Sequence, residues 1–215
     1  MIEMALDQPW LTARLPAPMR CLSWAPHRPG FVTTDTVIWR EVRNADLTRD
    51  FDAITWLADA LTDRGDMQAV GMLTSRDLRH FRLDHAVSGR FQASCLATVG
   101  LSNAERVGHR LPLERREPGT INLLTVTDAP LSEAAQIEAL SIAAQARTAA
   151  VMEARLDLPT GRATGTGTDC IVIACPPGDL QYAGLHTEVG EAIGRATYQA
   201  VTSGARHWME TEFKA

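Results

Sequence analysis

Apolar and β-branched residues gather into short runs that predict strands at five places in the chain. The runs cover residues 31–39, 69–73, 91–99, 120–127 and 170–175, and glycine or turn-favouring residues bound each of them. The last run, CIVIAC, shows no alternation of polar and apolar residues. We therefore expect both faces of that strand to be buried.

Apolar residues at helical spacing predict three helices. The first covers about residues 51–61, with Thr48 or Asp50 as its N-cap. The clearest helix covers about residues 131–155, and the last runs from about residue 188 to at least residue 203. Each has one apolar face that can pack on a sheet.

Strands and helices alternate only loosely, which bears on the fold class. No helix separates the two strands around Gly89, or the return from Val99 to Thr120. We therefore expect an α+β fold in which helices flank a mixed β-sheet, with a regular parallel α/β fold as the alternative. The proline-containing stretches 9–29 and 110–118 are short enough to be loops.

Length and composition favour a single domain over residues 1–215. The chain has 215 residues, 45% of them hydrophobic, and no Ser/Gly/Pro-rich linker divides it. The net charge is −5 and the arginines are scattered, so we expect no nucleic-acid partner. The start of the chain lacks a secretory pattern, and no apolar run approaches the ~20 residues of a membrane span. The cytoplasm is the expected location.

The four cysteines do not form a recognised framework. Cys21, Cys95, Cys170 and Cys175 show no CxxC spacing, so neither a zinc site nor a set of disulfides is expected. No HExxH motif or histidine cluster indicates a metal, and no GxSxG motif indicates an ordinary catalytic triad.

The segment just before the buried run 170–175 carries the strongest candidate chemistry. It is a loop of alternating threonine and glycine that ends at Asp169, and its members are Thr164, Gly165, Thr166, Gly167 and Thr168. Three hydroxyl groups and an accessible main chain suit an amide-bearing ligand, although a tight entry to the strand would use the same residues. Asp169 borders an apolar run, so its carboxylate must be paired or hydrogen-bonded, or have the raised pKa that suits a general base.

A second group of polar residues follows the same run. Tyr182, His186 and Thr187 lead into the last predicted helix, where the helix dipole favours a neutral imidazole. His186 is therefore either a candidate base or an exposed residue of the first turn. Gly190 and Gly194 share one helix face, which would allow close packing within the chain or a homodimer contact.

Two strand ends add amide and hydroxyl groups. Thr98 ends one strand and leads to Ser102 and Asn103, and Thr120 with Asn122 opens the next. An asparagine side chain has both a donor and an acceptor, so it complements a carboxamide and can polarise a carbonyl group. Such residues are also common in turns.

Six motifs in this order resemble the adenosylcobinamide amidohydrolase (CbiZ-type) family of corrinoid salvage enzymes. They cover roughly residues 73–201 and comprise LTSRD (73–77), TVGLSNA (98–104), GTIN (119–122), QARTAAV (145–151), TGTGTD (164–169) and YAGLHTEVG (182–190). One departure is Arg147, where the family pattern suggests lysine.

The resemblance implies hydrolysis of the amide between the corrin ring and its aminopropanol arm, which gives adenosylcobyric acid for cobalamin synthesis. On this basis we expect Asp169, with His186 as second candidate, to activate water, and Asn103 with the amides of the Thr/Gly loop to stabilise the oxyanion. A covalent route through Thr168 or Ser102 stays open. The residues expected to bind substrate are Thr98, Ser102, Thr120, Asn122, Thr164, Gly165, Thr166, Gly167, Thr168, Tyr182 and Thr187.

Two other functions use the same polar cleft. A non-catalytic corrinoid or tetrapyrrole carrier would need no base, and an enzyme for a smaller amide would have a narrow pocket. The Asp-x-His-x-x-Gly pattern of proteins that ligate cobalt through histidine is absent, so we expect the corrinoid to be a substrate and no other cofactor to be needed. A bulky corrin predicts a wide mouth near Tyr182, Leu185 and a tryptophan.

Overall fold

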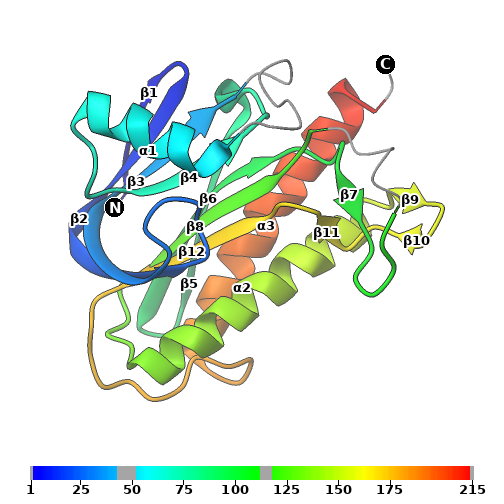
Figure 1. The fold of residues 1–215 in the computed structure, drawn as a ribbon. Coiled ribbons are helices and arrows are strands. Elements are labelled where there is room, and N and C mark those ends of the chain that lie inside the picture. The colour runs from blue at the N-terminus through cyan, green and yellow to red at the C-terminus, as the bar shows by residue number, and fades with distance from the viewer. Residues whose placement is uncertain (1, 43–51, 112–117, 214–215) are drawn as a thin grey trace.

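The apolar run CIVIAC forms the central strand of the fold, β12 (Cys170–Cys175), and all six of its residues are buried. In the computed structural model, which describes residues 2–42, 52–111 and 118–213, eight strands of the described chain form one mixed sheet. Seven of them lie in the order β4-β3-β2-β12-β8-β6-β5, and β1 pairs with β2 outside this path (Figure 1). The remaining strands of the sheet are β1 (Glu3–Asp7), β2 (Trp10–Ser23), β3 (Gly30–Glu41), β4 (Val70–Thr74), β5 (Arg82–Ser88), β6 (Phe91–Val99) and β8 (Ile121–Thr127).

Strand direction confirms the predicted α+β class. β12 is parallel to β8, and β3 is parallel to β4, while the other pairs of the sheet are antiparallel. The pair around Gly89 is the β5–β6 hairpin, and β6 is antiparallel to β8, with no helix in residues 100–111 and 118–120, the described part of their connection. Short strands outside the sheet pair β7 (Ala104–Glu105) with β11 (Gly165–Thr166), and β9 (Asp157–Leu158) with β10 (Gly161–Arg162).

The three predicted helices are present, and side-chain caps fix where each begins. They are α1 (Ala53–Arg64), α2 (Glu133–Glu153) and α3 (Glu188–Thr211). Asp52 caps α1, accepting hydrogen bonds from the amides of Ile54 and Thr55 at 3.1 Å each. The caps expected there, Thr48 and Asp50, lie outside the described residues.

The prediction that residues 9–29 form a loop is wrong. Much of this stretch is β2, a strand of 14 residues that pairs with both β3 and β12. The register against β3 shifts between Arg14 and Met19, and Pro16 and Pro18 lie inside that interruption. Proline is tolerated there because a bulge requires no ladder hydrogen bond from its nitrogen.

The curled sheet separates two large cores. One face of β6, β8 and β12 packs against α2 and α3, through residues such as Ile121, Ile171 and Ile193 (Figure 1). The opposite face closes on β2, β3 and β4, where Leu124 and Trp39 belong to a second cluster. α1 covers the outer side of β3 and β4 through a third, smaller cluster. In the described parts of the chain, no helix is both long and apolar enough to cross a membrane.

Candidate functional site

Asp169 lies at the start of β12 with its carboxylate fully engaged. Oδ1 accepts a hydrogen bond from the amide of Ile121 at 3.1 Å and another from the hydroxyl of Thr166. Oδ2 accepts from the amide of Thr166 at 3.1 Å and forms an ion pair with Arg147 Nη1. The side chain of Asp169 is only 6% exposed. Each of these four contacts stabilises the ionised carboxylate.

Arg147 approaches this carboxylate from α2, the helix packed behind the Thr/Gly loop. Its side chain is 16% exposed, and burial lowers the pKa of its guanidinium. Gly165 makes the approach possible, because a Cβ at that position would lie 2.6 Å from Arg147 Nη1 and 2.7 Å from Asp169 Oδ2. The Arg147–Asp169 ion pair therefore lies beneath the Thr/Gly loop. Gly165 is the point at which the loop crosses this ion pair.

The Thr/Gly loop is also fastened to the segment that follows β6. Gly165 and Thr166 pair with β7, opposite Glu105 and Ala104. The amide of Gly167 donates to the carbonyl oxygen of Asn103 at 3.1 Å. These bonds bring two of the predicted site segments, TGTGTD and TVGLSNA, side by side.

Hydrogen bonds at the entry to β8 bring in two further motifs, GTIN and LTSRD. Thr120 Oγ1 donates to the carbonyl oxygen of Thr168 at 2.8 Å, and Thr168 Oγ1 donates to the carbonyl oxygen of Gly119 at 3.0 Å. Asn122 is buried and donates through Nδ2 to the carbonyl oxygen of Leu73 at 2.6 Å, and its Oδ1 lies 3.2 Å from Thr120 Oγ1, whose hydrogen it shares with the Thr168 carbonyl oxygen. Asn122 thus connects β8 to β4 across the curled sheet, and both ends of its carboxamide are used within the protein.

A cavity of about 400 Å³ opens where these segments meet. Four of the six motifs supply residues to its wall, and Pro26, Val42, Ala53 and Pro118 complete it. The motif residues are Leu73, Thr74, Ser75, Asn103, Gly119, Thr120 and Thr168. A fifth motif supplies Arg147, which holds the loop from behind. Asn103 also lines an adjoining cavity of about 480 Å³ beneath the end of α3.

Three predicted binding residues do not line this cavity. Thr98 is fully buried at the end of β6, opposite Asn122, and its hydroxyl has no hydrogen-bond partner. Ser102 is exposed and lines the adjoining cavity. Thr164 faces the other side of the loop, where its Oγ1 accepts from the amide of Val107 at 2.8 Å.

The sixth motif lies at the opposite end of β12. This strand has six residues, which span about 20 Å at ~3.3 Å per residue. Tyr182 and His186 are exposed in the connection that follows its far end. Thr187 caps α3 there and accepts from the amide of Gly190 at 3.0 Å. The structure therefore does not bring these three predicted site residues together with Asp169.

Gly190 and Gly194, two of the three glycines of α3, make contacts within the chain. A Cβ on Gly190 would lie 2.1 Å from the carbonyl oxygen of Gly184, so the glycine lets the preceding loop pack directly on the helix. A Cβ on Gly194 would lie 3.4 Å from Ile142 of α2. Gly190 is thus required by the packing of α3 against its own chain, whereas Gly194 would accept a methyl group with an ordinary contact.

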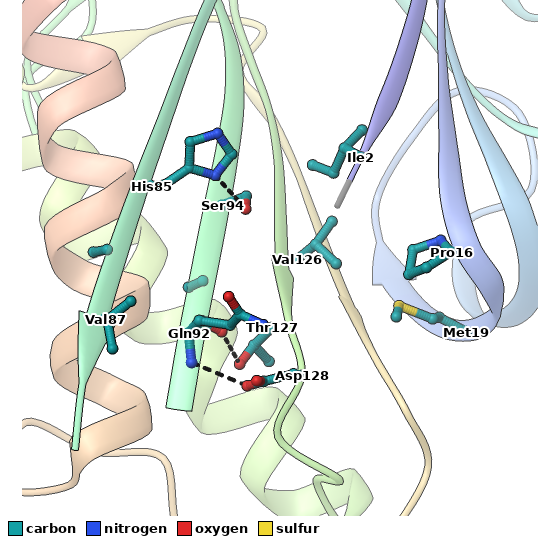
Figure 2. Close-up of a pocket in the computed structure, with 12 residues that line it drawn as sticks. Ile2, Pro16, Met19, His85, Val87, Gln92, Ser94, Val126, Thr127 and Asp128 are labelled. Atoms are coloured by element: carbon teal, nitrogen blue, oxygen red, sulfur yellow. Dashed lines mark hydrogen bonds between the residues drawn. The ribbon is translucent and has the colours of Figure 1, made fainter. Parts of the chain in front are cut away.

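A further cavity, of about 380 Å³, opens beside the first residues of β6 and the last residues of β8, at the end of the sheet away from Asp169 (Figure 2). His85 Nδ1 lies 2.7 Å from Ser94 Oγ, and the amide of Gln92 donates to Asp128 Oδ1 at 3.0 Å. None of the residues that line it belongs to the six motifs. We therefore place the candidate site at the other cavity, beside Asn103.

Sequence reasoning missed three contributors to the candidate site. Leu73, Thr74 and Ser75 were part of a motif but had no assigned role. Arg147 lies 22 positions before Asp169, and only helix packing shows that they pair. Trp24 donates from Nε1 to the carbonyl oxygen of Asp169 at 2.6 Å, from a stretch predicted to be a loop. In the described residues, no group of three or more His, Cys, Asp or Glu side chains is placed to hold a metal ion.

Comparisons with known proteins agree with the motifs. A profile of the adenosylcobinamide amidohydrolase family matches residues 2–212. An adenosylcobinamide amidohydrolase from Halobacterium salinarum is 36% identical over 113 residues, 49% of this chain and 46% of that protein. An uncharacterized protein from Methanocaldococcus jannaschii is 36% identical over 91 residues, 40% of this chain and 36% of that protein.

An adenosylcobinamide amidohydrolase from Methanosarcina mazei is 26% identical over 157 residues, 68% of this chain and 70% of that protein. The chain thus spans less than half the length of the first two relatives in the matched regions.

Proposed function

Because the chain belongs to the adenosylcobinamide amidohydrolase family, we propose that it hydrolyses the amide between the corrin ring and the aminopropanol arm of adenosylcobinamide. Water adds to the amide carbonyl, the C–N bond breaks, and the products are adenosylcobyric acid and 1-aminopropan-2-ol. The first product would re-enter cobalamin synthesis. The observation that carries this proposal is that four of the six family motifs line one cavity, and a fifth supplies the arginine that holds its Thr/Gly loop.

The wall of this cavity offers a place for the oxyanion. Gly119 lines it, and a Cβ there would lie 2.7 Å from the amide nitrogen of Asn103 and 3.0 Å from that of Ser102. The main chain of Gly119 therefore packs directly against two consecutive main-chain amides at the cavity wall. We assign these amides, together with the Asn103 carboxamide, to the stabilisation of the tetrahedral intermediate.

Asp169 suits a positioning role better than that of the general base. A base must offer a free lone pair within hydrogen-bond reach of the attacking water. Both oxygens of Asp169 already accept two donors each, and the side chain is almost fully buried. In this proposal Asp169 and Arg147 hold the Thr/Gly loop, so that Thr168 and Asn103 face the substrate.

An assay of released 1-aminopropan-2-ol with adenosylcobinamide as substrate tests the proposal. We expect the wild-type protein to release the amine. Gly119→Ala should lower kcat by about 10²-fold or more, because its methyl group would collide with the amides of Ser102 and Asn103 and displace them, and Asn103→Ala should also lower kcat. Gly194→Ala, which adds the same methyl group on α3, should retain wild-type kcat.

Three outcomes would contradict the assignment. Tight binding of the intact corrinoid without release of amine would make the protein a carrier. Turnover of small amides alone would identify a different substrate. Full activity of Gly119→Ala would remove the two main-chain amides from the mechanism.

A further inference from the structure

The candidate cavity is too small for the whole of its proposed substrate, and this inference rests on the function proposed above. A cavity of about 400 Å³ has the size that encloses a small organic ligand. A corrin macrocycle with its ring of carboxamide arms is much larger. Only the arm with the scissile amide can enter, so the macrocycle must lie against the protein outside the cavity.

Trp24 presents an apolar surface at that place. Its side chain is 47% exposed. Pro26, two residues after Trp24, lines the cavity. Thr168 also lines it, and Thr168 directly precedes Asp169, whose carbonyl oxygen accepts the hydrogen bond from the Trp24 indole. A single exposed apolar side chain is ordinary on a protein surface. Trp24 differs because its indole N–H is fixed on the carbonyl oxygen of Asp169, which sets the orientation of the ring.

The loop that carries Trp24 is attached to β4 and to the residues before it. His27 and Gly71 exchange two main-chain hydrogen bonds, of 3.3 and 3.2 Å, which attach the loop to β4. Arg28 Nη1 donates to the carbonyl oxygen of Gln68. The ring is therefore ordered before any ligand arrives, which lowers the entropic cost of binding against it.

We propose that Trp24 is a specificity-determining residue, whose indole packs against the corrin macrocycle while the aminopropanol arm enters the cavity beside Asn103. The exposed face of the Trp24 indole thereby selects substrates in which the amide is attached to a large ring system. It contributes binding energy shared by the ground state and the transition state, so its loss should raise KM and leave kcat nearly unchanged.

Steady-state kinetics with adenosylcobinamide, combined with calorimetric binding of dicyanocobyric acid, tests this role. Dicyanocobyric acid has the macrocycle without the arm, so its binding reports on the macrocycle alone. We expect Trp24→Ala to raise KM and to weaken binding of this probe by about tenfold each. Trp24→Phe, which keeps an aromatic ring but loses the N–H, should stay within about threefold of wild type in both measurements. Leu6→Ala, which shortens a similarly exposed side chain on β1, should change neither.

The opposite results would overturn the proposal. A fall in kcat with unchanged KM in both Trp24 variants would show that the indole serves only to hold Asp169. Weakened binding of dicyanocobyric acid by Tyr182→Ala, with Trp24→Ala unaffected, would place the macrocycle at the other end of β12. If the wild-type protein does not cleave adenosylcobinamide, the proposed function fails. If the wild-type protein cleaves it and binds dicyanocobyric acid, and Trp24→Ala has the same KM and the same affinity for the probe, only the role of Trp24 is rejected.

Discussion

At the scale of single residues, the pair of Asp169 and Arg147 decides the shape of the candidate site. A buried carboxylate and guanidinium are costly to remove from water, and they are tolerated here because each compensates the other. The carboxylate also collects the amides of Ile121 and Thr166, so one side chain joins β8, the Thr/Gly loop and α2.

Removing either partner should therefore destabilise the fold. We expect Asp169→Asn and Arg147→Met each to lower the free energy of unfolding by about 3 kcal/mol, because each leaves its partner buried without compensation. The double variant should lose much less than the sum. Urea denaturation of the four proteins measures this, and strictly additive losses would show that the two groups do not interact.

At the scale of elements, Gly204 and Gly194 of α3 differ in whether the helix packing leaves room for a side chain. A Cβ on Gly204 would lie 2.6 Å from Val99 Cγ2 and 2.9 Å from Val99 Cβ, so the helix packs directly against β6 at that point. A Cβ on Gly194 would make only an ordinary contact with Ile142. The first glycine is required by packing, and the second is not.

The same substitution should thus change stability in opposite directions. Gly204→Ala should lower the free energy of unfolding by about 1–3 kcal/mol, because the methyl group forces α3 away from β6. Gly194→Ala should raise it by up to about 1 kcal/mol through helix propensity. Chemical denaturation of both variants gives the sign of each change, and stabilisation by Gly204→Ala would contradict the packing seen here.

Elements with a strong local pattern could be predicted from the sequence. β12 and α2 were predicted because a run without polar residues and a long 3.6-residue period each have one simple solution. β2 was missed because Pro16 and Pro18 look like loop residues, and their place in a register shift depends on the partner strand. At the candidate site, the convergence of Asn103, Thr120 and Thr168 followed from the motifs.

The positions of Trp24, Arg147 and His186 could not be predicted in the same way. Trp24 and Arg147 reach Asp169 across tertiary contacts that leave no periodic signal. His186 is closer to Asp169 in sequence than Arg147 is, yet the extended length of β12 carries it to the other end of the sheet.

At the scale of the whole molecule, the four cysteines show how well the core excludes solvent. All four are buried free thiols. Burial raises the pKa of Cys21, Cys95 and Cys170 from 9.0 to about 12, because a thiolate would be desolvated. The same cause raises the pKa of Cys175.

We expect the folded protein to resist alkylation by iodoacetamide at pH 8, and the unfolded chain to react at all four cysteines. The contribution of the cysteines to the free energy of unfolding should be constant with pH up to about 9 and then fall as pH rises toward 12, because only the unfolded chain releases its thiol protons there. Mass spectrometry of the alkylated protein and denaturation at pH 8 and pH 10 measure the two effects. Rapid alkylation of the native protein would contradict the tight core.

The position of β12 in the sheet has a consequence for biosynthesis. Strands β2 to β4 come from the first third of the chain, β5 to β8 from the middle, and β12 is the only member of the main sheet path that joins the two groups. On the ribosome, both groups must therefore wait with an open edge until residues 170–175 emerge from the exit tunnel. Nascent chains of this protein gain their completed sheet only after residues 170–175 have been synthesised, and until then their apolar edges are exposed to chaperones and to neighbouring chains.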